Sequence, residues 1–120
     1  MKKLFISCPM RGRTEEAIRA TMEQMQNIAE AIFEQHLEVV LTYFEGNPPK
    51  GTNERLWYLG ESIKKMSEAD YYIGVYDEQN GYDGCVIENK TALLYGLPRF
   101  LVNIAYVAPD VMKVRSEYPF

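Results

Sequence analysis

The chain has 120 residues, a net charge of −4 at pH 7 and hydrophobic residues at 47% of its positions, which suits one globular domain over residues 1–120. Its lysines and arginines are scattered rather than gathered into a stripe, so we expect a small ligand and no nucleic-acid partner. Two cysteines and one histidine are too few for a disulfide framework or a zinc site, so we expect neither a metal nor a cofactor.

The N-terminal apolar run is short. Leu4 to Ile6 is followed within a few residues by Ser7, Pro9 and Arg11. Such a run is too short for the apolar region of a signal peptide or for a membrane span. We therefore predict a cytoplasmic protein that has no membrane partner.

The apolar pattern predicts strands that alternate with helices. Strands are expected at 3–7, 37–43, 71–76 and 100–104, and helices at about 14–35, at 53–69 and from Asp83 or Gly84 to Gly96. This alternation favours right-handed crossovers and a mostly parallel sheet covered on both faces. We predict an α/β fold, a three-layer Rossmann-like or flavodoxin-like sandwich of four to five strands in the order 2-1-3-4. The tail from Ala105 onward shows no clear period and is expected to cover a sheet edge or pack on a neighbouring subunit.

The loop after the first strand, SCPMRGRT from Ser7 to Thr14, opens the first helix, so its amides and the helix dipole are suited to an anion such as phosphate. It matches neither of the two common glycine-rich phosphate loops. A Cys-x5-Arg phosphatase loop needs an arginine at Thr14, and Arg13 comes one position early. Because no histidine base lies nearby in the sequence, we interpret Cys8 as a packing residue rather than a nucleophile.

A strand, a polar loop and a helix follow one another in the stretch from Tyr71 to Gly96, and Glu88 lies near the start of that helix. Ligands of open α/β sheets bind outside the carboxyl ends of the strands, so this stretch predicts an edge of the site. Asp83 and Gly84 are expected to cap the helix. The helical neighbours of Glu88 are mostly small or apolar, which suits a carboxylate that points into a cleft, although composition alone favours a side chain in solvent. The alternative is a solvated glutamate paired with Lys90.

Other polar and aromatic residues are weaker candidates for the same site. Asp77 ends the third predicted strand, where ligand-binding groups are common, although a turn-forming aspartate is the alternative. Trp57 and Tyr58 on the second helix, with Phe5 on the first strand, are suited to a flat wall for a base, although aromatics at such spacing more often belong to the core. His36 is expected at the surface.

Three segments resemble the nucleoside 2-deoxyribosyltransferase-like superfamily, and in particular its small, often phage- or prophage-encoded members. They are KLFISCPMRG at the first strand, SEADYYIGVYD leading into the third, and GYDGCVIENKTALLYGLP after it. The most specific motif is a glutamate eight residues before a glycine, which corresponds to Glu88 and Gly96.

The resemblance implies a function. The matching glutamate of characterised relatives is the nucleophile on the anomeric carbon, so Glu88 would be the catalytic residue that cleaves the N-glycosidic bond of a nucleoside or nucleoside monophosphate, by hydrolysis or transfer. Relatives assemble as dimers or larger rings, so a homo-oligomer is implied. With the base expected near Phe5 or Trp57, the predicted substrate-binding residues are Phe5, Ser7, Cys8, Pro9, Met10, Arg11, Gly12, Asp77, Asp83 and Gly84.

The chain departs from the family pattern on the second helix. Characterised relatives carry there an aspartate that assists protonation of the base, eight residues before the position of Asp70. Here that position is Ser62, with Glu61 beside it on a different helix face. A serine supplies no carboxylic proton at neutral pH. Two alternatives therefore stand beside the enzyme: a nucleotide-binding or interaction module without turnover, and a structural oligomer component whose exposed aromatics, such as Tyr106, Tyr118 and Phe120, form an interface.

Overall fold

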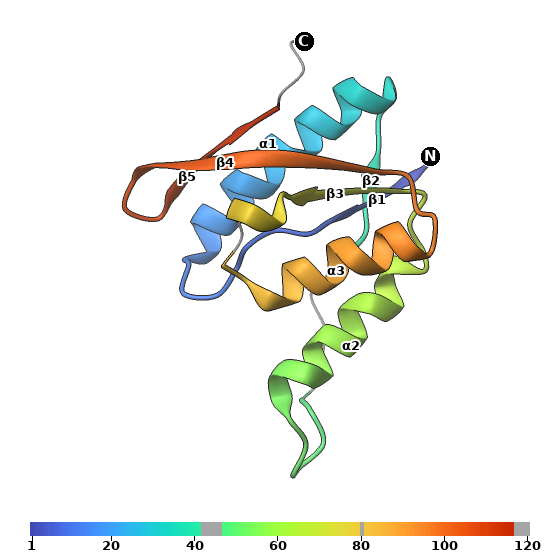
Figure 1. Ribbon diagram of the computed structural model, residues 1–120, viewed down its shortest axis with the longest axis vertical. Coiled ribbons are helices and arrows are strands. Elements are labelled where there is room, and N and C mark those ends of the chain that lie inside the picture. The colour runs from blue at the N-terminus through green and yellow to red at the C-terminus, as the bar shows by residue number, and fades with distance from the viewer. Residues whose placement is uncertain (42–46, 80, 117–120) are drawn as a thin grey trace.

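The computed structural model describes residues 1–41, 47–79 and 81–116 (Figure 1). In chain order its elements are β1 (Lys3–Ile6), α1 (Glu15–Phe33), β2 (Glu38–Val39), α2 (Glu54–Met66), β3 (Tyr71–Val75), the 3₁₀ turn η1 (Asp77–Gln79), α3 (Asp83–Leu94), β4 (Arg99–Ala108) and β5 (Val111–Arg115). The strands form one mixed sheet in the order β2-β1-β3-β4-β5. β1 to β4 run parallel, and β5 is antiparallel to β4. The predicted α/β class and the order 2-1-3-4 are confirmed.

The fifth strand was missed in the sequence. β4 continues to Ala108, beyond its predicted end at Ile104, and the chain returns as β5 after Asp110, which adopts a left-handed conformation (φ 59°). In β5 the residues alternate between exposed and buried, with Met112 and Val114 facing inward. Two buried positions give too short an alternation to distinguish from an irregular tail. β5 covers the sheet edge at β4, whereas Tyr118 and Phe120 lie outside the described residues.

The second strand is shorter than predicted. β2 comprises only Glu38–Val39, although 37–43 was expected. Leu37 and Val40 are buried beside it, and the Val40 amide still donates to the carbonyl of Leu4 at 2.8 Å, whereas Thr42 and Tyr43 lie outside the described residues. Burial of an apolar run is therefore a poor guide to strand length at this sheet edge.

The first two helices begin where the sequence predicts. Thr14 caps α1 by accepting a hydrogen bond from the amide of Ala17 at 3.1 Å, and Asn53 caps α2 by accepting one from the amide of Leu56 at 3.0 Å. The expected cap of α3 is wrong. Its N-cap is Tyr82, which makes no side-chain cap bond, and Asp83 lies in the first turn.

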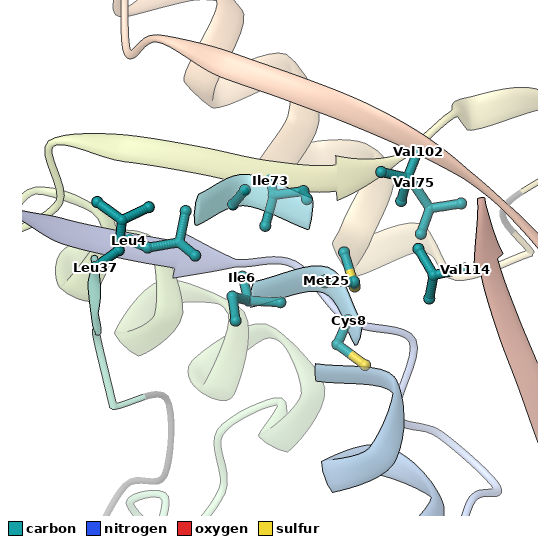
Figure 2. Packing of buried hydrophobic residues seen from close by; sticks show 10 residues of the cluster. Leu4, Ile6, Cys8, Met25, Leu37, Ile73, Val75, Val102 and Val114 are labelled. Carbon is teal, nitrogen blue, oxygen red and sulfur yellow. The ribbon is translucent and has the colours of Figure 1, made fainter. Parts of the chain in front are cut away.

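Residues alternate between the two faces of the sheet with the period of two that strands impose. Leu4, Ile6 and Ile73 point towards α1 and form an apolar core with Met25 (Figure 2). On the other face Phe5 and Tyr72 pack with Met66 of α2 and Ala92 of α3. One helix therefore covers one face of the sheet, and α2 and α3 cover the other (Figure 1). None of the described helices is long and apolar enough to cross a bilayer.

Candidate functional site

A cavity of about 1020 Å³ opens between α2, α3 and the carboxyl end of β1. It is placed at the strand tips, where α/β proteins bind ligands. Its lining includes residues of β1 and of the following loop, the first half of α2, and the first turns of α3: Phe5, Ile6, Cys8, Met10, Arg11, Asn47, Asn53, Arg55, Leu56, Tyr58, Leu59, Ser62, Tyr82, Asp83, Gly84, Cys85, Ile87 and Glu88.

Glu88 is the buried carboxylate of this cavity. Its exposed fraction is 9%, and each of its two oxygens accepts a hydrogen bond from a serine. The Ser7 hydroxyl donates to Oε1 at 2.8 Å, and the Ser62 hydroxyl donates to Oε2. Burial raises the pKa of the Glu88 carboxyl, and the two serine hydrogen bonds oppose that rise by stabilising the anion. The predicted inward orientation is confirmed, and the alternative is excluded because Lys90 is exposed.

Ser62 therefore lies on the carboxylate itself. Its hydroxyl can donate a hydrogen bond to Glu88, but it offers no acid for a leaving group at neutral pH. The sequence contained a signal for this contact: Leu59, Ser62 and Met66 are spaced three and four residues apart, so they share the helix face that looks at α3. Glu61 instead pairs with Lys64, with 3.7 Å between Oε1 and Nζ.

Asn89, next to Glu88, fastens α3 to the sheet and is buried, with an exposed fraction of 1%. Its Nδ2 donates to the carbonyl of Val75 at 2.6 Å and to Oδ1 of Asp77 at 2.9 Å. Its Oδ1 accepts a hydrogen bond from the Tyr72 hydroxyl. The Asn89 side chain occupies space that is open only because residue 74 is glycine: a Cβ on Gly74 would overlap Asn89 Oδ1 and come within 2.9 Å of the Tyr72 ring. Asp77 is thus engaged in holding α3 and is absent from the cavity lining.

The first loop is shaped by Arg13, whose side chain is 3% exposed. Its Nη1 donates to the carbonyl of Pro9 at 2.9 Å, and its Nε pairs with Oδ1 of Asp110 at 3.0 Å. Asp110 also accepts from the amide of Thr14 at 3.0 Å. The Thr14 and Arg13 hydrogen bonds and the Arg13 charge hold the pKa of Asp110 below its usual value. The carboxylate of Asp110 therefore occupies part of the predicted anion site at the start of α1.

The cations of the cavity lie towards solvent. Arg11 is exposed and lines the cavity, and within the described ranges no carboxylate pairs with it. Arg55 lines the cavity from α2 and lies 3.9 Å from Asp83, with both side chains largely exposed. Arg11 is consequently available to an anionic ligand, whereas Arg13 is not.

Cys8 is a thiol rather than a thiolate at neutral pH. Burial, partly offset by the Arg13 charge, raises its pKa to about 12. Cys85 is buried as well. A nucleophilic cysteine needs a lowered pKa, so Cys8 suits the packing role that the sequence predicts. The described residues contain no group of three His, Cys, Asp or Glu side chains that could hold a metal ion.

The aromatic wall differs from the predicted one. Phe5 has no exposed surface and stacks on Tyr72, with 5.7 Å between ring centroids and 6° between planes. Trp57 packs edge-on against Tyr58, with 5.0 Å between ring centroids, and is absent from the lining. Besides the buried Phe5, the aromatic residues of the lining are Tyr58 and Tyr82, and Tyr82 was not singled out in the sequence. His36 is at the surface, with 93% of its side chain exposed.

Comparisons with protein-family models, with curated proteins and with solved structures each found no significant match. The family resemblance therefore stays a prediction.

The structure brings most of the predicted site residues together around Glu88. Phe5, Cys8, Met10, Arg11, Asp83 and Gly84 line the cavity, and Ser7 contacts the carboxylate. Besides Ser7, three predicted substrate-binding residues, Pro9, Gly12 and Asp77, are absent from the lining. Pro9 is buried, and its carbonyl accepts from Arg13, while Gly12 makes the turn at a φ of 77°.

Proposed function

We propose that this chain cleaves the N-glycosidic bond of a nucleoside monophosphate or a nucleoside, with Glu88 as the nucleophile on the anomeric carbon. The observation that carries the proposal is a buried carboxylate, hydrogen-bonded through both oxygens, in a cavity at the strand tips. The parallel strands β1 to β4 with helices on both faces support a Rossmann-like three-layer description of the domain. The family resemblance adds the type of reaction.

The carboxylate of Glu88 suits this reaction. Cleavage of an N-glycosidic bond builds positive charge on the anomeric carbon, and an adjacent carboxylate stabilises that charge or forms a glycosyl ester. Ser7 and Ser62 fix the orientation of both oxygens, which places the anion before the substrate arrives. Water then releases the sugar, or a second base accepts it.

The surroundings of Glu88 suit a nucleoside monophosphate. Ligand cavities typically measure about 300–1,000 Å³, and this one measures about 1020 Å³. Arg11 supplies an unpaired cation for a phosphate, since no described carboxylate engages it. Tyr58 and Tyr82 offer rings that can contact the base.

Departure of the base is the slow step in this proposal. Apart from Glu88, the described lining contains one carboxylate, Asp83, and most of its side chain is exposed. Ser62 cannot act as the acid that protonates the leaving base. We therefore expect a slow enzyme, and one that favours substrates whose base leaves readily.

The test incubates purified protein with separate ribo- and deoxyribonucleosides and their 5′-monophosphates, and liquid chromatography then resolves the released bases. We expect a free base from at least one monophosphate, and none from the Glu88→Gln variant. Glu61→Gln is the matched control, because Glu61 pairs with Lys64 and is absent from the cavity lining. The proposal is wrong if the wild-type protein releases no base from any member of the panel.

A second candidate is a nucleotide-binding module without turnover. The observation that favours it is Ser62, which stands beside Glu88 where an acid would assist the leaving base. A ligand that binds only the folded state raises the melting temperature. A melting shift with nucleotides, together with no base release on long incubation, supports the binding module and contradicts the enzyme.

A further inference from the structure

A tight turn in the first loop presents Arg11 to the cavity. The amide of Arg13 donates to the carbonyl of Met10 at 3.1 Å, which closes a turn of four residues. Gly12, in the third position, adopts a φ of 77°, the positive value that a type II turn requires there. Arg11 therefore occupies the second position of the turn, and its exposed side chain lines the cavity.

Arg13, the last residue of this turn, is held in place by its almost fully buried side chain. Its Nη1 donates to the carbonyl of Pro9 at 2.9 Å, and its Nη2 donates to the hydroxyl oxygen of Thr21 in α1 at 2.9 Å. Its Nε pairs with Oδ1 of Asp110 at 3.0 Å. One rigid planar group thus connects the first loop, α1 and the β4–β5 hairpin.

Asp110 contacts this region from the turn between β4 and β5, 97 positions along the chain from Arg13 (Figure 1). Its second oxygen, Oδ2, accepts hydrogen bonds from the amide of Thr14 at 3.0 Å and from the hydroxyl of Thr14 at 3.2 Å. No other carboxylate of the described residues pairs with Arg13. Removing the Asp110 charge therefore leaves a buried cation without its counter-ion and frees the end of the turn.

We propose that Asp110 is a positioning residue for ligand binding, which acts through Arg13 to fix the turn that presents Arg11 to the phosphate of the ligand. The three charged side chains have separate tasks: Arg11 contacts the phosphate, Arg13 holds the turn, and Asp110 holds Arg13. The proposal rests on the proposed function, in which Arg11 meets a phosphate.

The sign of the effect separates this role from two others. A carboxylate that only repels the phosphate, or that competes with it for the start of α1, predicts tighter phosphate binding once its charge is removed. A carboxylate that positions Arg11 predicts weaker binding. The change in Kd on removal of the Asp110 charge therefore decides between them.

The test titrates the full-length protein with ribose 5-phosphate and, separately, with ribose, and follows both by NMR. The two probes differ only in the phosphate, and neither has an N-glycosidic bond that the protein could cleave. Arg11→Gln should weaken ribose 5-phosphate binding by about tenfold, because it removes a hydrogen bond between two charged groups. If wild-type protein binds ribose 5-phosphate no more tightly than ribose, Arg11 meets no phosphate and the proposal is overturned.

Asp110→Asn removes the charge and keeps the hairpin turn, since asparagine tolerates the left-handed backbone at this position (φ 59°). We expect ribose 5-phosphate binding to weaken by about three- to tenfold and ribose binding to stay the same. Equal or tighter ribose 5-phosphate binding in folded Asp110→Asn overturns the proposal.

Asp70→Asn is the matched control. Its carboxylate also accepts a hydrogen bond from a backbone amide, that of Lys3, at 2.8 Å. Asp70 directly precedes β3, so it lies at the amino ends of the parallel strands, away from the cavity at the carboxyl end of β1. Neither Kd should change in this variant.

Arg13→Lys covers the case in which Asp110→Asn does not fold, and it leaves the net charge unchanged. A single lysine nitrogen cannot serve Pro9, Thr21 and Asp110 as the guanidinium does. Ribose 5-phosphate binding should again weaken by about three- to tenfold. Arg19→Lys is its control, because Arg19 pairs with Glu15 on the exposed surface of α1. An Arg13→Lys protein that binds ribose 5-phosphate as tightly as wild type overturns the proposal.

A double variant shows whether Asp110 acts through Arg11. Once Arg11→Gln has removed the contact with the phosphate, adding Asp110→Asn should weaken ribose 5-phosphate binding no further. A further weakening of the same size as in the single variant would place the effect of Asp110 elsewhere and overturn the proposal.

The order of the turn gives a readout without any ligand. Relaxation of ¹⁵N nuclei should give the Gly12 and Arg13 amides an order parameter of about 0.85 in wild type, falling towards about 0.6 in Asp110→Asn. Asp70→Asn should keep the wild-type values. Unchanged order parameters in Asp110→Asn overturn the proposal.

Enzyme assays then separate this proposal from the proposed function. If the chain releases base, Asp110→Asn should raise KM for a nucleoside monophosphate by the same factor as the ribose 5-phosphate Kd, with kcat and the KM for the nucleoside unchanged. If wild-type protein releases no base but binds ribose 5-phosphate more tightly than ribose, the proposed function fails, and the Kd values still decide whether Asp110 positions Arg11.

Discussion

The two faces of the sheet differ in the polarity of the residues that they bury. On the α1 face, Leu4, Ile6, Met25 and Ile73 are all buried in an apolar cluster. On the α2 and α3 face, the buried residues include a carboxylate and an amide, Glu88 and Asn89, beside a large cavity. Burying a polar group costs stability unless it is hydrogen-bonded, and a buried charge costs more than a buried neutral group. The first face is therefore an apolar core, whereas the second holds a carboxylate and an amide through hydrogen bonds beside the cavity.

The difference continues along α2. Met66, at its C-terminal end, is buried, whereas Leu56, near its N-terminal end, is 64% exposed. Only one end of α2 packs closely on the sheet, and the other forms a wall of the cavity. A helix that packed along its whole length would fill the space that a ligand needs.

The largest expected effect is the loss of stability from a substitution in the apolar cluster on the α1 face of the sheet. Met25→Ala should lower the free energy of unfolding by about 2–5 kcal/mol, because it leaves a cavity in a fully buried cluster. Leu56→Ala is the matched change on the other face, and it should stay within about 0.5 kcal/mol because the side chain is already exposed. Urea unfolding at pH 7 measures both. Equal losses in the two variants would contradict the division between the faces.

A smaller effect is expected from crowding the polar face. Gly74→Ala should cost about 1–3 kcal/mol, since its Cβ would overlap Asn89 Oδ1 and press on the Tyr72 ring. Gly60→Ala, in α2, is the control: nothing lies within 4 Å of its Cβ, and alanine favours a helix by up to about 1 kcal/mol. Thermal unfolding compares the two. A Gly74→Ala protein as stable as wild type would mean that Asn89 does not lie where we describe it.

The smallest effect is a pH dependence. The folded-state pKa of Glu88 is raised, so its stabilising contribution is full below the unfolded-state pKa and is lost as pH rises through the folded-state pKa. Glu88→Gln has no such loss, so its stability relative to wild type should increase as pH rises through that window. Urea unfolding at a series of pH values measures the difference. If the stability of Glu88→Gln relative to wild type instead fell as pH rose, a raised pKa of Glu88 would be contradicted.

Local signals in the sequence were sufficient for much of the fold. The starts of α1 and α2 were predicted at about Thr14 and Asn53, and each of these residues caps its helix by bonding an amide three residues away. The small and apolar residues around Glu88 on one helix were compatible with its inward orientation, although composition alone favoured a side chain in solvent. Such features depend on spacing within a single element, and spacing can be read directly.

Contacts between distant segments were not predictable. Arg13 and Asp110 pair across 97 positions, and Ser7 and Glu88 across 81. Asp110 belongs to the β4–β5 hairpin, which was not predicted. Its hydrogen bonds with Arg13 and Thr14 of the first loop could therefore not be predicted either. The structural role of Asn89 could not be predicted, because its three side-chain partners come from β3 and η1. The roles of these residues follow from the packing of separate elements rather than from any local pattern.

The central claim is that the Glu88 carboxyl takes part in the reaction. Its most direct test is the rate of base release by Glu88→Gln relative to wild type, on the best substrate and with the ligand Kd measured in parallel. If Glu88 is the nucleophile, Glu88→Gln should release base at least about 10³-fold more slowly than wild type, with a ligand Kd that is little changed. A variant that keeps more than about a tenth of the wild-type rate would contradict it.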